Sequence, residues 1–169
     1  MLRRQRARGF TLVELLIVVA IIAILAGIAI PNLLMALQRA KQKRTMANMR
    51  NIATAWEARA TDLSRYNGAG VTVDGMTAPV TMDDLEAAIT PTYMKSMPRV
   101  DGWSRDFIGV VEYGWAAGNF AQRYGLISGG RDGIFEGSPA LGATSNFDCD
   151  IIYSNGQFMQ YPDGLQAGR

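Results

Sequence analysis

The stretch Gly9-Phe10-Thr11-Leu12-Val13-Glu14 decides how the rest of the chain is organised. An uncharged and largely apolar run from Leu15 to Leu37 follows it, and four arginines precede it: Arg3, Arg4, Arg6 and Arg8. A membrane-spanning helix needs roughly 20 apolar residues, whereas the apolar part of a cleavable secretory signal has about 7–15. The length of this run therefore predicts a retained membrane helix.

Glu14 is the only charged residue between Gly9 and Gln38, in a segment that is otherwise uncharged and largely apolar. An acidic side chain within a spanning helix costs on the order of 3 kcal/mol, and such residues are usually paired. One interpretation is that Glu14 has a partner. The other is that its carboxylate reaches the membrane edge, because Glu14 lies only one turn from Phe10.

Pro31 interrupts the apolar run without ending it. A proline removes one backbone donor and clashes with the carbonyl four residues earlier, which here belongs to Gly27. Glycine weakens a helix further. Gly27–Pro31 is therefore predicted to be a weak turn that is kinked or able to melt, and the alternative is a tolerated kink of the kind common in membrane helices.

A basic collar follows the apolar run, with no acid among residues 39–50: Arg39, Lys41, Lys43, Arg44 and Arg50. Such a cluster beside an apolar helix suits a membrane surface. Nucleic acid is the competing partner, but from Asn51 onward the chain has 14 acidic and 8 basic residues. That acidic remainder argues against nucleic acid as the primary partner.

Beyond the collar, an apolar stripe at helical spacing predicts that the helix continues to residue 66: Met46, Met49, Ala53, Trp56, Ala60 and Leu63. Tyr66-Asn67-Gly68 is a stop signal. Thr81 with two acids after it marks a second helix start. The last third is β in character, and Ser154-Asn155-Gly156 is a strong hairpin signal.

The fold class predicted from these patterns is α+β, with one long helix packed on a small antiparallel sheet of three or four strands. We divide the chain into a leader (1–9), an apolar membrane helix (10–37), the amphipathic half of the same helix (38–66) and an α+β head (67–169).

The composition excludes several kinds of catalytic site. The chain has no histidine and a single cysteine, Cys149, so it lacks Ser-His-Asp and Cys-His constellations and an intrachain disulfide. A membrane-anchored enzyme or binding domain stays open as an alternative. Its best candidate residues are Asp101, Asp106 and Glu112, or the acids of the long loop described next.

Residues 129–149 contain five glycines and form a predicted long loop, with acids at Asp132, Glu136 and Asp148 and with Asp150 just beyond. Loops of this length are uncommon in compact domains and are often functional. Calcium takes six to eight oxygen ligands, which this loop could supply, although no EF-hand spacing is present. The alternative is a set of solvated acids on a flexible loop.

Two segments resemble the type IV pilin-like family: Arg8-Gly9-Phe10-Thr11-Leu12-Val13-Glu14-Leu15-Leu16 and Ile28-Ala29-Ile30-Pro31-Asn32. The resemblance implies cleavage after Gly9 by a prepilin peptidase and N-methylation of Phe10. It implies that Glu14 attracts the Phe10 amine of a neighbouring subunit, and that Gly27–Pro31 melts in the assembled filament.

The same resemblance implies a location and a set of partners. The subunit is held in the bacterial inner membrane by a single helix, with its head in the periplasm, before it enters a periplasmic or cell-surface filament. Its implied partners are other copies of itself, prepilin peptidase, the inner-membrane assembly platform and minor pilins or pseudopilins. The function implied is structural and non-catalytic.

The second half narrows the resemblance to the major pseudopilins of type II secretion, which serve protein export. Three segments carry it: Thr90–Pro98, Asp101-Gly102-Trp103 and Tyr124–Gly133. In that group the loop binds calcium, which carries over here to the carbonyls of Leu126 and Ser128 and to the side chains of Asp132, Asp148 and Asp150.

The sequence departs from the pseudopilin pattern at two places, so a second class of pilin remains an alternative. The loop between Asp132 and Asp148 is longer than in the pseudopilin pattern, and Trp103 follows a glycine where the pattern has Pro-Trp-Gly. A calcium-free type IV pilus pilin, serving adhesion, twitching motility or DNA uptake, is the alternative.

Overall fold

The computed structural model describes residues 9–62, 78–111, 124–136 and 141–167. Within these residues the chain forms two helices and six strands. It separates into two compact units, one up to Leu37 and one from Gln38 onward. Each unit is described by itself.

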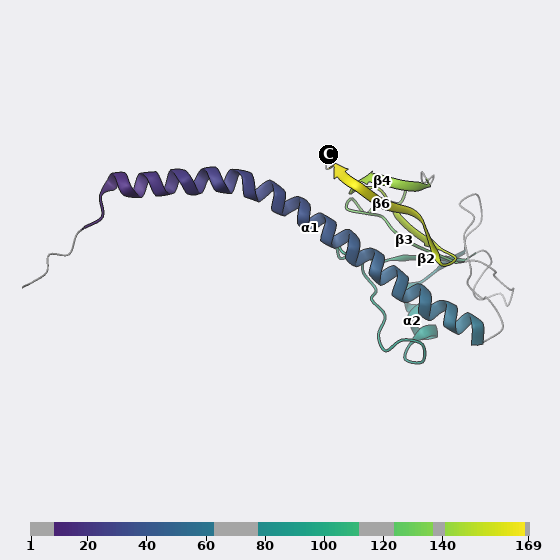
Figure 1. Ribbon diagram of the computed structural model, residues 1–169. Coiled ribbons are helices and arrows are strands. Elements are labelled where there is room, and N and C mark those ends of the chain that lie inside the picture. The colour runs from purple at the N-terminus through teal and green to yellow at the C-terminus, as the bar shows by residue number, and fades with distance from the viewer. Residues whose placement is uncertain (1–8, 63–77, 112–123, 137–140, 168–169) are drawn as a thin grey trace, which may run out of the picture. The chain divides into compact units, whose positions relative to one another are not determined.

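Helix α1 (Leu12–Asp62) begins in the first unit and passes through Pro31 as a continuous helix (Figure 1). From Leu12 to Leu37 every large apolar side chain is at least 40% exposed. By length and composition this helix is able to cross a membrane, with a mean hydropathy of 3.0 over its most apolar window. The predicted weak turn at Gly27–Pro31 is helical here, and its melting in a filament stays a prediction.

The part of α1 in the second unit buries one face. Met49, Ala53 and Trp56 are each no more than 1% exposed and Ala60 is 2% exposed, which confirms these members of the predicted stripe. Met46 packs against the same core from its edge. Leu63 and the predicted stop at Tyr66-Asn67-Gly68 lie outside the described residues.

Helix α2 (Met82–Ile89) begins where the sequence predicted. The Thr81 hydroxyl caps it by accepting a hydrogen bond from the Asp84 N–H at 3.1 Å, which satisfies one of the free donors of the first turn. The helix buries Met82, Leu85 and Ile89.

The described strands form one sheet in the order β1-β2-β3-β5-β6-β4. Their bounds are Ala78–Val80 (β1), Ile108–Val111 (β2), Tyr124–Ser128 (β3), Gly142–Asn146 (β4), Ile151–Ser154 (β5) and Gln157–Ala167 (β6). All neighbouring pairs are antiparallel except β4 and β6, which are parallel. The prediction of a small antiparallel sheet with three or four strands is therefore corrected to a mixed sheet of six.

The predicted hairpin joins β5 to β6. Asn155 and Gly156 both have positive φ, 49° and 82°, as the two central residues of a type I′ turn require. Asparagine and glycine adopt this conformation at low cost, so the sequence signal and the observed turn have the same physical origin.

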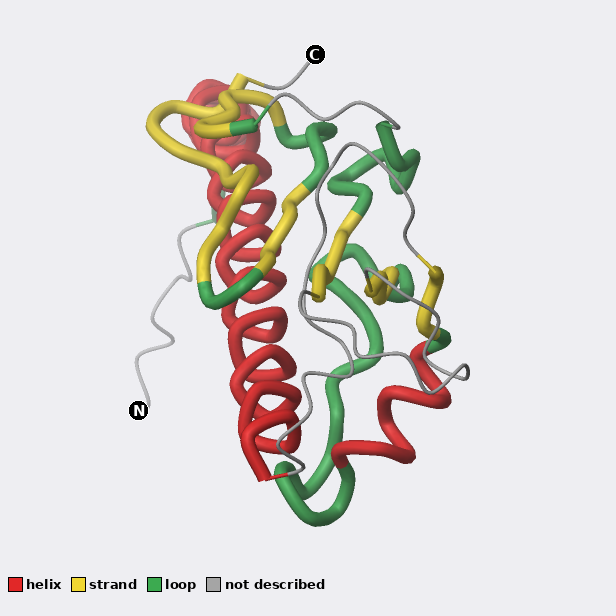
Figure 2. The backbone as a smooth tube through the Cα atoms, turned by 90° about the vertical axis from the view of Figure 1, so that its right-hand side faces the viewer, coloured by secondary structure: helices red, strands yellow, loops and turns green. Residues whose placement is uncertain are grey.

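The α+β class and the packing of the helix on the sheet are confirmed. Figures 1 and 2 show the strands lying along one side of the second part of α1. The core between them contains Trp56 and Tyr124, whose ring centroids are 5.0 Å apart, together with Leu126 and Tyr153. Alternate residues of the central strands, Val110, Ile127 and Ile152, form a smaller cluster.

The glycine-rich segment is not one long loop. Residues 142–146 form β4, which pairs with β6, so the described part of the segment is a turn after β3 and a strand at the sheet edge. The sequence Gly-Ala-Thr-Ser-Asn has little strand propensity. Its pairing depends on β6, which is distant in the sequence and could not be inferred locally.

Candidate functional site

The residues around the predicted processing site lie immediately before α1. Gly9, Phe10 and Thr11 precede the helix, and Phe10 is 75% exposed. The bond between Gly9 and Phe10 therefore lies in a non-helical, exposed segment, as a protease requires of its substrate backbone.

Glu14 has a local partner that sequence reasoning missed. One oxygen of its carboxylate, Oε2, accepts hydrogen bonds from the Thr11 N–H at 2.9 Å and the Thr11 hydroxyl at 2.8 Å. The Glu14 N–H donates to the Thr11 hydroxyl at 3.2 Å. This is a capping box, in which the first and fourth residues satisfy each other's backbone donors.

The signal for this cap is Thr-x-x-Glu at residues 11–14. The sequence-based prediction for Glu14 rests on its charge within an apolar run and does not use this spacing. A carboxylate near the first turn also interacts favourably with the positive end of the helix dipole. The cap therefore stabilises Glu14 within its own chain before any neighbour is present.

A second organising carboxylate is Asp101, which is 2% exposed. Its Oδ1 accepts hydrogen bonds from the N–H groups of Trp103 at 2.8 Å and Arg105 at 3.0 Å. Its Oδ2 accepts one from the Ser128 hydroxyl at 2.8 Å. Both oxygens are engaged, so Asp101 holds the loop to the end of β3 and is a poor candidate for catalysis.

The two residues after Asp101 attach the loop to α1. The Gly102 N–H donates to the Thr45 hydroxyl at 2.8 Å, and the Trp103 indole N–H donates to Gln38 Oε1 at 2.7 Å. A Cβ on Gly102 would overlap the backbone of Lys41. Only glycine permits this approach, which gives the Asp-Gly-Trp sequence a structural reason. Of the other enzyme candidates, Asp106 is exposed and Glu112 lies outside the described residues.

The predicted calcium ligands lie at and after the end of β3. Leu126 and Ser128 are buried residues of that strand, paired with Tyr153 and Ile151 of β5. Gly129 and Gly133 close a turn by a backbone hydrogen bond of 2.8 Å. In this turn Asp132 accepts a hydrogen bond from the Ile134 N–H at 2.9 Å.

Asp148 is held by a guanidinium group. Arg131 donates from Nε to one carboxylate oxygen at 2.6 Å and from a terminal nitrogen to the other at 2.7 Å. The Arg131 N–H also donates to the Phe147 carbonyl at 2.9 Å. This bidentate ion pair, which sequence reasoning missed, ties the turn after β3 to the segment before β5.

Asp150 is fully buried, and only one of its two carboxylate oxygens accepts a hydrogen bond from a described residue. Its Oδ2 accepts a hydrogen bond from the Glu136 N–H at 3.0 Å, while its Oδ1 has no hydrogen-bond partner among the described residues. Burial raises the pKa of the Asp150 carboxyl to about 6, and the carboxylates of Glu136 and Asp132 also raise it. A cation at Oδ1 would give this oxygen a partner and would lower the pKa of the carboxyl.

The structure thus brings Asp132 and Asp150 into one electrostatic neighbourhood with Glu136, and it places Asp148 in an ion pair with Arg131. Among the described residues no three acidic or cysteine side chains converge closely enough to hold a metal by themselves. A calcium ion here would therefore need backbone carbonyls as well as Asp150, and the ligation by Leu126, Ser128, Asp132, Asp148 and Asp150 stays a prediction.

The chain is similar to known proteins at its start and over most of its length. Residues 4–30 match the prokaryotic N-terminal methylation motif. The chain is 31% identical over 137 residues to type II secretion system core protein G of Klebsiella michiganensis, covering 79% of this chain and 89% of the relative. The corresponding Escherichia coli K12 protein is 27% identical over 132 residues, 76% of this chain and 85% of the relative.

Type IV pilins are similar over a shorter region. Type IV major pilin protein PilA of Myxococcus xanthus is 48% identical over 62 residues, which is 37% of this chain and 28% of the relative. No solved structure matches the chain significantly.

A methylation motif at the head of a long apolar helix, continued into the core of an α+β head, defines a pilin-like protein. Within that class, the similarity across most of both chains decides the family. The chain belongs to the type II secretion system core protein G family, the pseudopilin family expected from its sequence.

Proposed function

We propose that this chain is the structural subunit of a type II secretion filament, processed by prepilin peptidase and polymerised from the inner membrane. The observation that carries the proposal is the apolar part of α1, residues 12–37, whose large side chains have no partner within the described chain and remain exposed. Such a surface has to be covered by lipid or by other copies of the same helix.

The start of α1 supplies the two chemical groups that assembly needs. Cleavage between Gly9 and Phe10 frees an amine one residue before Thr11, and the Glu14 carboxylate lies at the first turn. The amine of one subunit pairs with the Glu14 carboxylate of another. In an apolar surrounding this attraction is much stronger than in water, although desolvation offsets part of it.

Processing and assembly are tested separately in cells that contain prepilin peptidase and the secretion assembly platform. Intact mass spectrometry is expected to find a mature chain that starts at N-methylated Phe10. Glu14→Gln keeps the size of the side chain but removes its charge, so it is expected to be processed normally and to form few or no filaments by electron microscopy.

The matched control is Thr11→Ala, which removes the hydroxyl of the capping box and leaves the Glu14 charge in place. Filament yield is expected to fall far less than in Glu14→Gln, since the charge that pairs with the amine is kept and only a cap of about 0.5–2 kcal/mol is lost. A mature chain that retains residues 1–9, or normal filaments from Glu14→Gln, would falsify the proposal.

A type IV pilus pilin is the second candidate, favoured by the high identity of residues near the start to pilins such as PilA. That similarity covers 37% of the chain, whereas the core protein G relative covers 79%. We therefore prefer secretion. Restoration of secretion in a strain lacking its core protein G supports this choice, and restoration of twitching in a strain lacking its major pilin supports the alternative.

We further propose that the head binds calcium near Asp150. The support is the buried Asp150 Oδ1, which lacks a hydrogen bond, beside the carboxylates of Asp132 and Glu136. Asp148 joins the ligands only if Arg131 releases it. Calcium supplies a divalent charge that neutralises these acids and cross-links the turn after β3 to the segment before β5.

Calcium binding is measured by thermal denaturation of the full chain in detergent, with calcium or with a chelator. A ligand present at 100 times its dissociation constant stabilises the native state by about 2.7 kcal/mol, so a clear rise in melting temperature is expected. Asp150→Asn is expected to abolish the rise, and Asp106→Asn, an exposed acid outside the loop, to preserve it. An equal melting temperature with calcium and with chelator would remove this proposal.

A further inference from the structure

A pocket with both basic and acidic residues lies in the second unit, between the basic collar of α1 and residues 162–166 of β6. Its volume is about 320 Å³, at the lower end of the roughly 300–1,000 Å³ typical of small-ligand sites. Six of its lining residues carry the argument: Arg39, Gln42, Lys43, Met46, Asp163 and Gln166.

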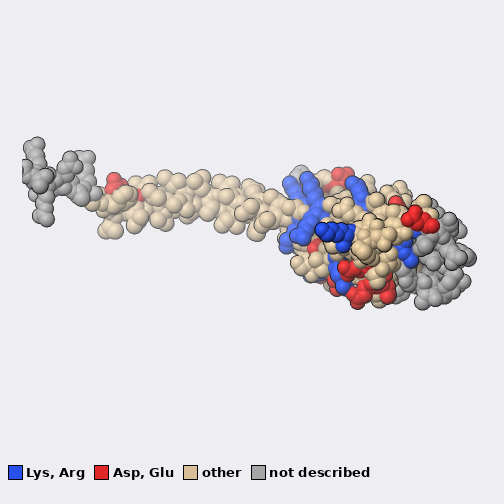
Figure 3. All heavy atoms as spheres, turned by 90° about the horizontal axis from the view of Figure 1, so that it is seen from below, with Lys and Arg blue, Asp and Glu red and all other residues tan. Residues whose placement is uncertain are grey.

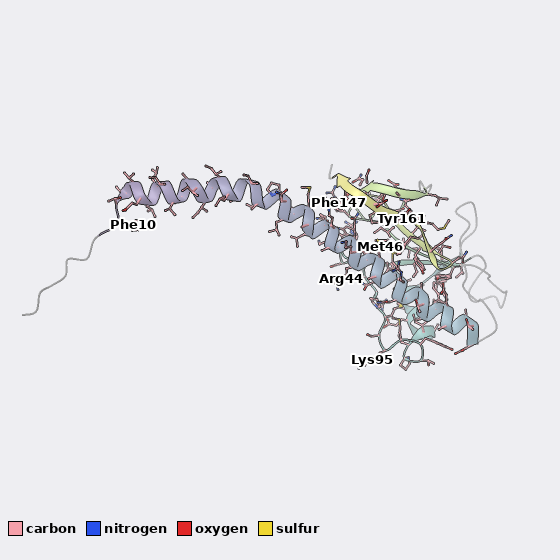
Figure 4. The ribbon with its side chains drawn as sticks, in the orientation of Figure 1. Phe10, Arg44, Met46, Lys95, Phe147 and Tyr161 are labelled. Carbon is pink, nitrogen blue, oxygen red and sulfur yellow. The ribbon has the colours of Figure 1, made fainter. Side chains whose placement is uncertain are left out.

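The collar residues of the pocket share one face of the helix. Arg39, Gln42, Lys43 and Met46 are spaced i, i+3, i+4 and i+7, which places them on the same side of α1. Arg44 does not line the pocket. In Figure 4, Met46 lies on the side of α1 that faces β6, and Arg44 lies on the other side.

The floor of the pocket is a fixed hydrogen-bond network. Gln42 and Gln166 are buried, and Gln42 Nε2 donates to Gln166 Oε1 at 3.2 Å. Gln166 Nε2 donates to the carbonyls of Thr144 at 2.7 Å and Asp163 at 2.9 Å. This network holds the collar against β6 and uses none of the charged groups at the rim.

The rim carries positive groups that lack acceptors. Arg39 Nε is buried and has no hydrogen-bond partner among the described residues. Within that part of the chain, neither Arg39 nor Lys43 takes part in an ion pair. A buried guanidinium N–H without an acceptor is costly, and phosphate oxygens fit the geometry of that group.

Asp163 adds a negative group to the same rim. One of its oxygens accepts a hydrogen bond from the Gly164 N–H at 2.8 Å, and no described residue pairs with it as a cation. A ligand that carries a phosphate and an ammonium group together would match Arg39 and Lys43 on one side and Asp163 on the other.

The position of Arg39 in the chain indicates the source of such a ligand. Arg39 follows Leu37, the last residue of the apolar run, by two residues, which is at most about 7 Å of chain. A collar so close to a membrane-spanning segment is held near lipid headgroups. Figure 3 shows Lys and Arg side chains gathered at the start of the second unit, whereas the preceding helix is uncharged apart from Glu14.

We propose that this pocket binds a phospholipid headgroup of the phosphatidylethanolamine type, with the phosphate accepting hydrogen bonds from Arg39 and Lys43 and the ammonium group donating to Asp163. The pocket thereby recognises one class of lipid while the subunit is still in the membrane. This inference concerns the membrane-held subunit and does not depend on which filament it enters.

The test uses the full chain in a mild detergent and counts bound molecules by native mass spectrometry. The probes are phosphatidylethanolamine, phosphatidylglycerol and the soluble glycerophosphoethanolamine. Arg39→Gln with Lys43→Gln is expected to weaken phosphatidylethanolamine binding about tenfold or more, as the loss of charge-assisted hydrogen bonds implies. Lys41→Gln with Arg44→Gln removes the same charge outside the pocket and is expected to change binding less than about twofold.

Two further variants separate specific recognition from general attraction. Arg39→Lys keeps the charge and the fold but loses the guanidinium fork, so it is expected to weaken phosphatidylethanolamine binding severalfold. Asp163→Asn is expected to remove the preference for phosphatidylethanolamine over phosphatidylglycerol without weakening the latter.

Three results would overturn the proposal. Equal weakening by the two double variants would show that the collar attracts lipids only through its overall charge. An unchanged lipid preference in Asp163→Asn would remove the role of the ammonium group. Binding of glycerophosphoethanolamine as tight as that of the lipid would identify a soluble phosphate ester as the ligand.

Discussion

Helix α1 carries apolar side chains both before and after Leu37, but the two parts use them differently. Before that residue they surround the helix and remain at least 40% exposed. After it they form one stripe, and Met49, Ile52 and Trp56 are no more than 1% exposed. The two parts of α1 therefore differ in how their apolar residues are arranged around the helix. Where apolar side chains surround the helix, they need partners outside the chain; where they form one stripe, they pack into the core of the chain itself.

The largest contrast is expected from truncating one side chain in each part. Trp56→Ala opens a cavity beside Tyr124 and is expected to lower the free energy of unfolding of the head by about 3–5 kcal/mol. Leu25→Ala, at a residue that is 61% exposed, is expected to leave it unchanged. Thermal denaturation of the full chain in detergent measures both, and similar losses would contradict the distinction.

The two units also differ in how they hold a carboxylate, and pH reveals the difference. Glu14 is satisfied by its cap, whereas Asp150 is buried with one oxygen unpaired. Because the pKa of Asp150 is raised to about 6, the folded chain binds a proton that the unfolded chain loses near pH 4. Without calcium, stability is therefore expected to fall by roughly 2–3 kcal/mol as pH rises from about 4 to above 6.

Asp150→Asn removes the titrating group and is expected to flatten this slope. Melting temperatures of the two chains between about pH 4 and pH 7, in chelator, provide the measurement. A parallel slope in the variant would mean that other groups govern the pH dependence.

Glycines give a third contrast. Alanine at Gly102 would overlap the backbone of Lys41, so Gly102→Ala is expected to destabilise the head by about 1–3 kcal/mol. Gly27 has no atom within 4 Å of an added Cβ and lies in the helix, so Gly27→Ala is expected to strengthen α1 there by up to about 1 kcal/mol. Thermal denaturation monitors the first variant and hydrogen exchange of the helix amides the second. The contrast holds only if Gly102→Ala lowers the stability of its region and Gly27→Ala raises that of the helix.

The smallest contrast concerns the two helix caps. Thr81→Ala removes the cap of α2, which contributes Leu85 and Ile89 to the core, and is expected to lower the stability of the head by about 1 kcal/mol. Thr11→Ala removes the cap of α1 and is expected to increase amide exchange in its first turn only. A change in the melting temperature of the head on replacing Thr11 would show that the cap acts beyond its own turn.

Local signals in the sequence predicted much of the fold. The Thr81 cap, the Asn155-Gly156 turn and the stripe through Trp56 are confirmed because each depends on residues within a few positions. The pilin-like start was recognised for the same reason. Long-range pairing was not predicted: β4 was assigned to a loop because its sequence has weak strand character and its partner is β6.

The site residues divide in the same way. The capping box at Thr11 and Glu14 was readable from spacing alone but was overlooked. The roles of Asp101 and Arg131 could not be inferred, since their partners Ser128 and Asp148 are 27 and 17 residues away in the sequence. Asp101, a candidate catalytic group, accepts hydrogen bonds that hold a loop in place. Asp148, a candidate metal ligand, accepts hydrogen bonds from Arg131.

The two edges of the described sheet have a consequence for how such a subunit polymerises. One edge, β1, has only three residues, and its central Pro79 has no N–H to donate. The other edge, β4, has five residues and lacks large apolar side chains. Short, proline-interrupted or polar edges resist the addition of a further strand from another molecule. The described edges therefore disfavour growth through sheet extension, which leaves the exposed apolar side chains of residues 12–37 as the surface available for contact with other copies.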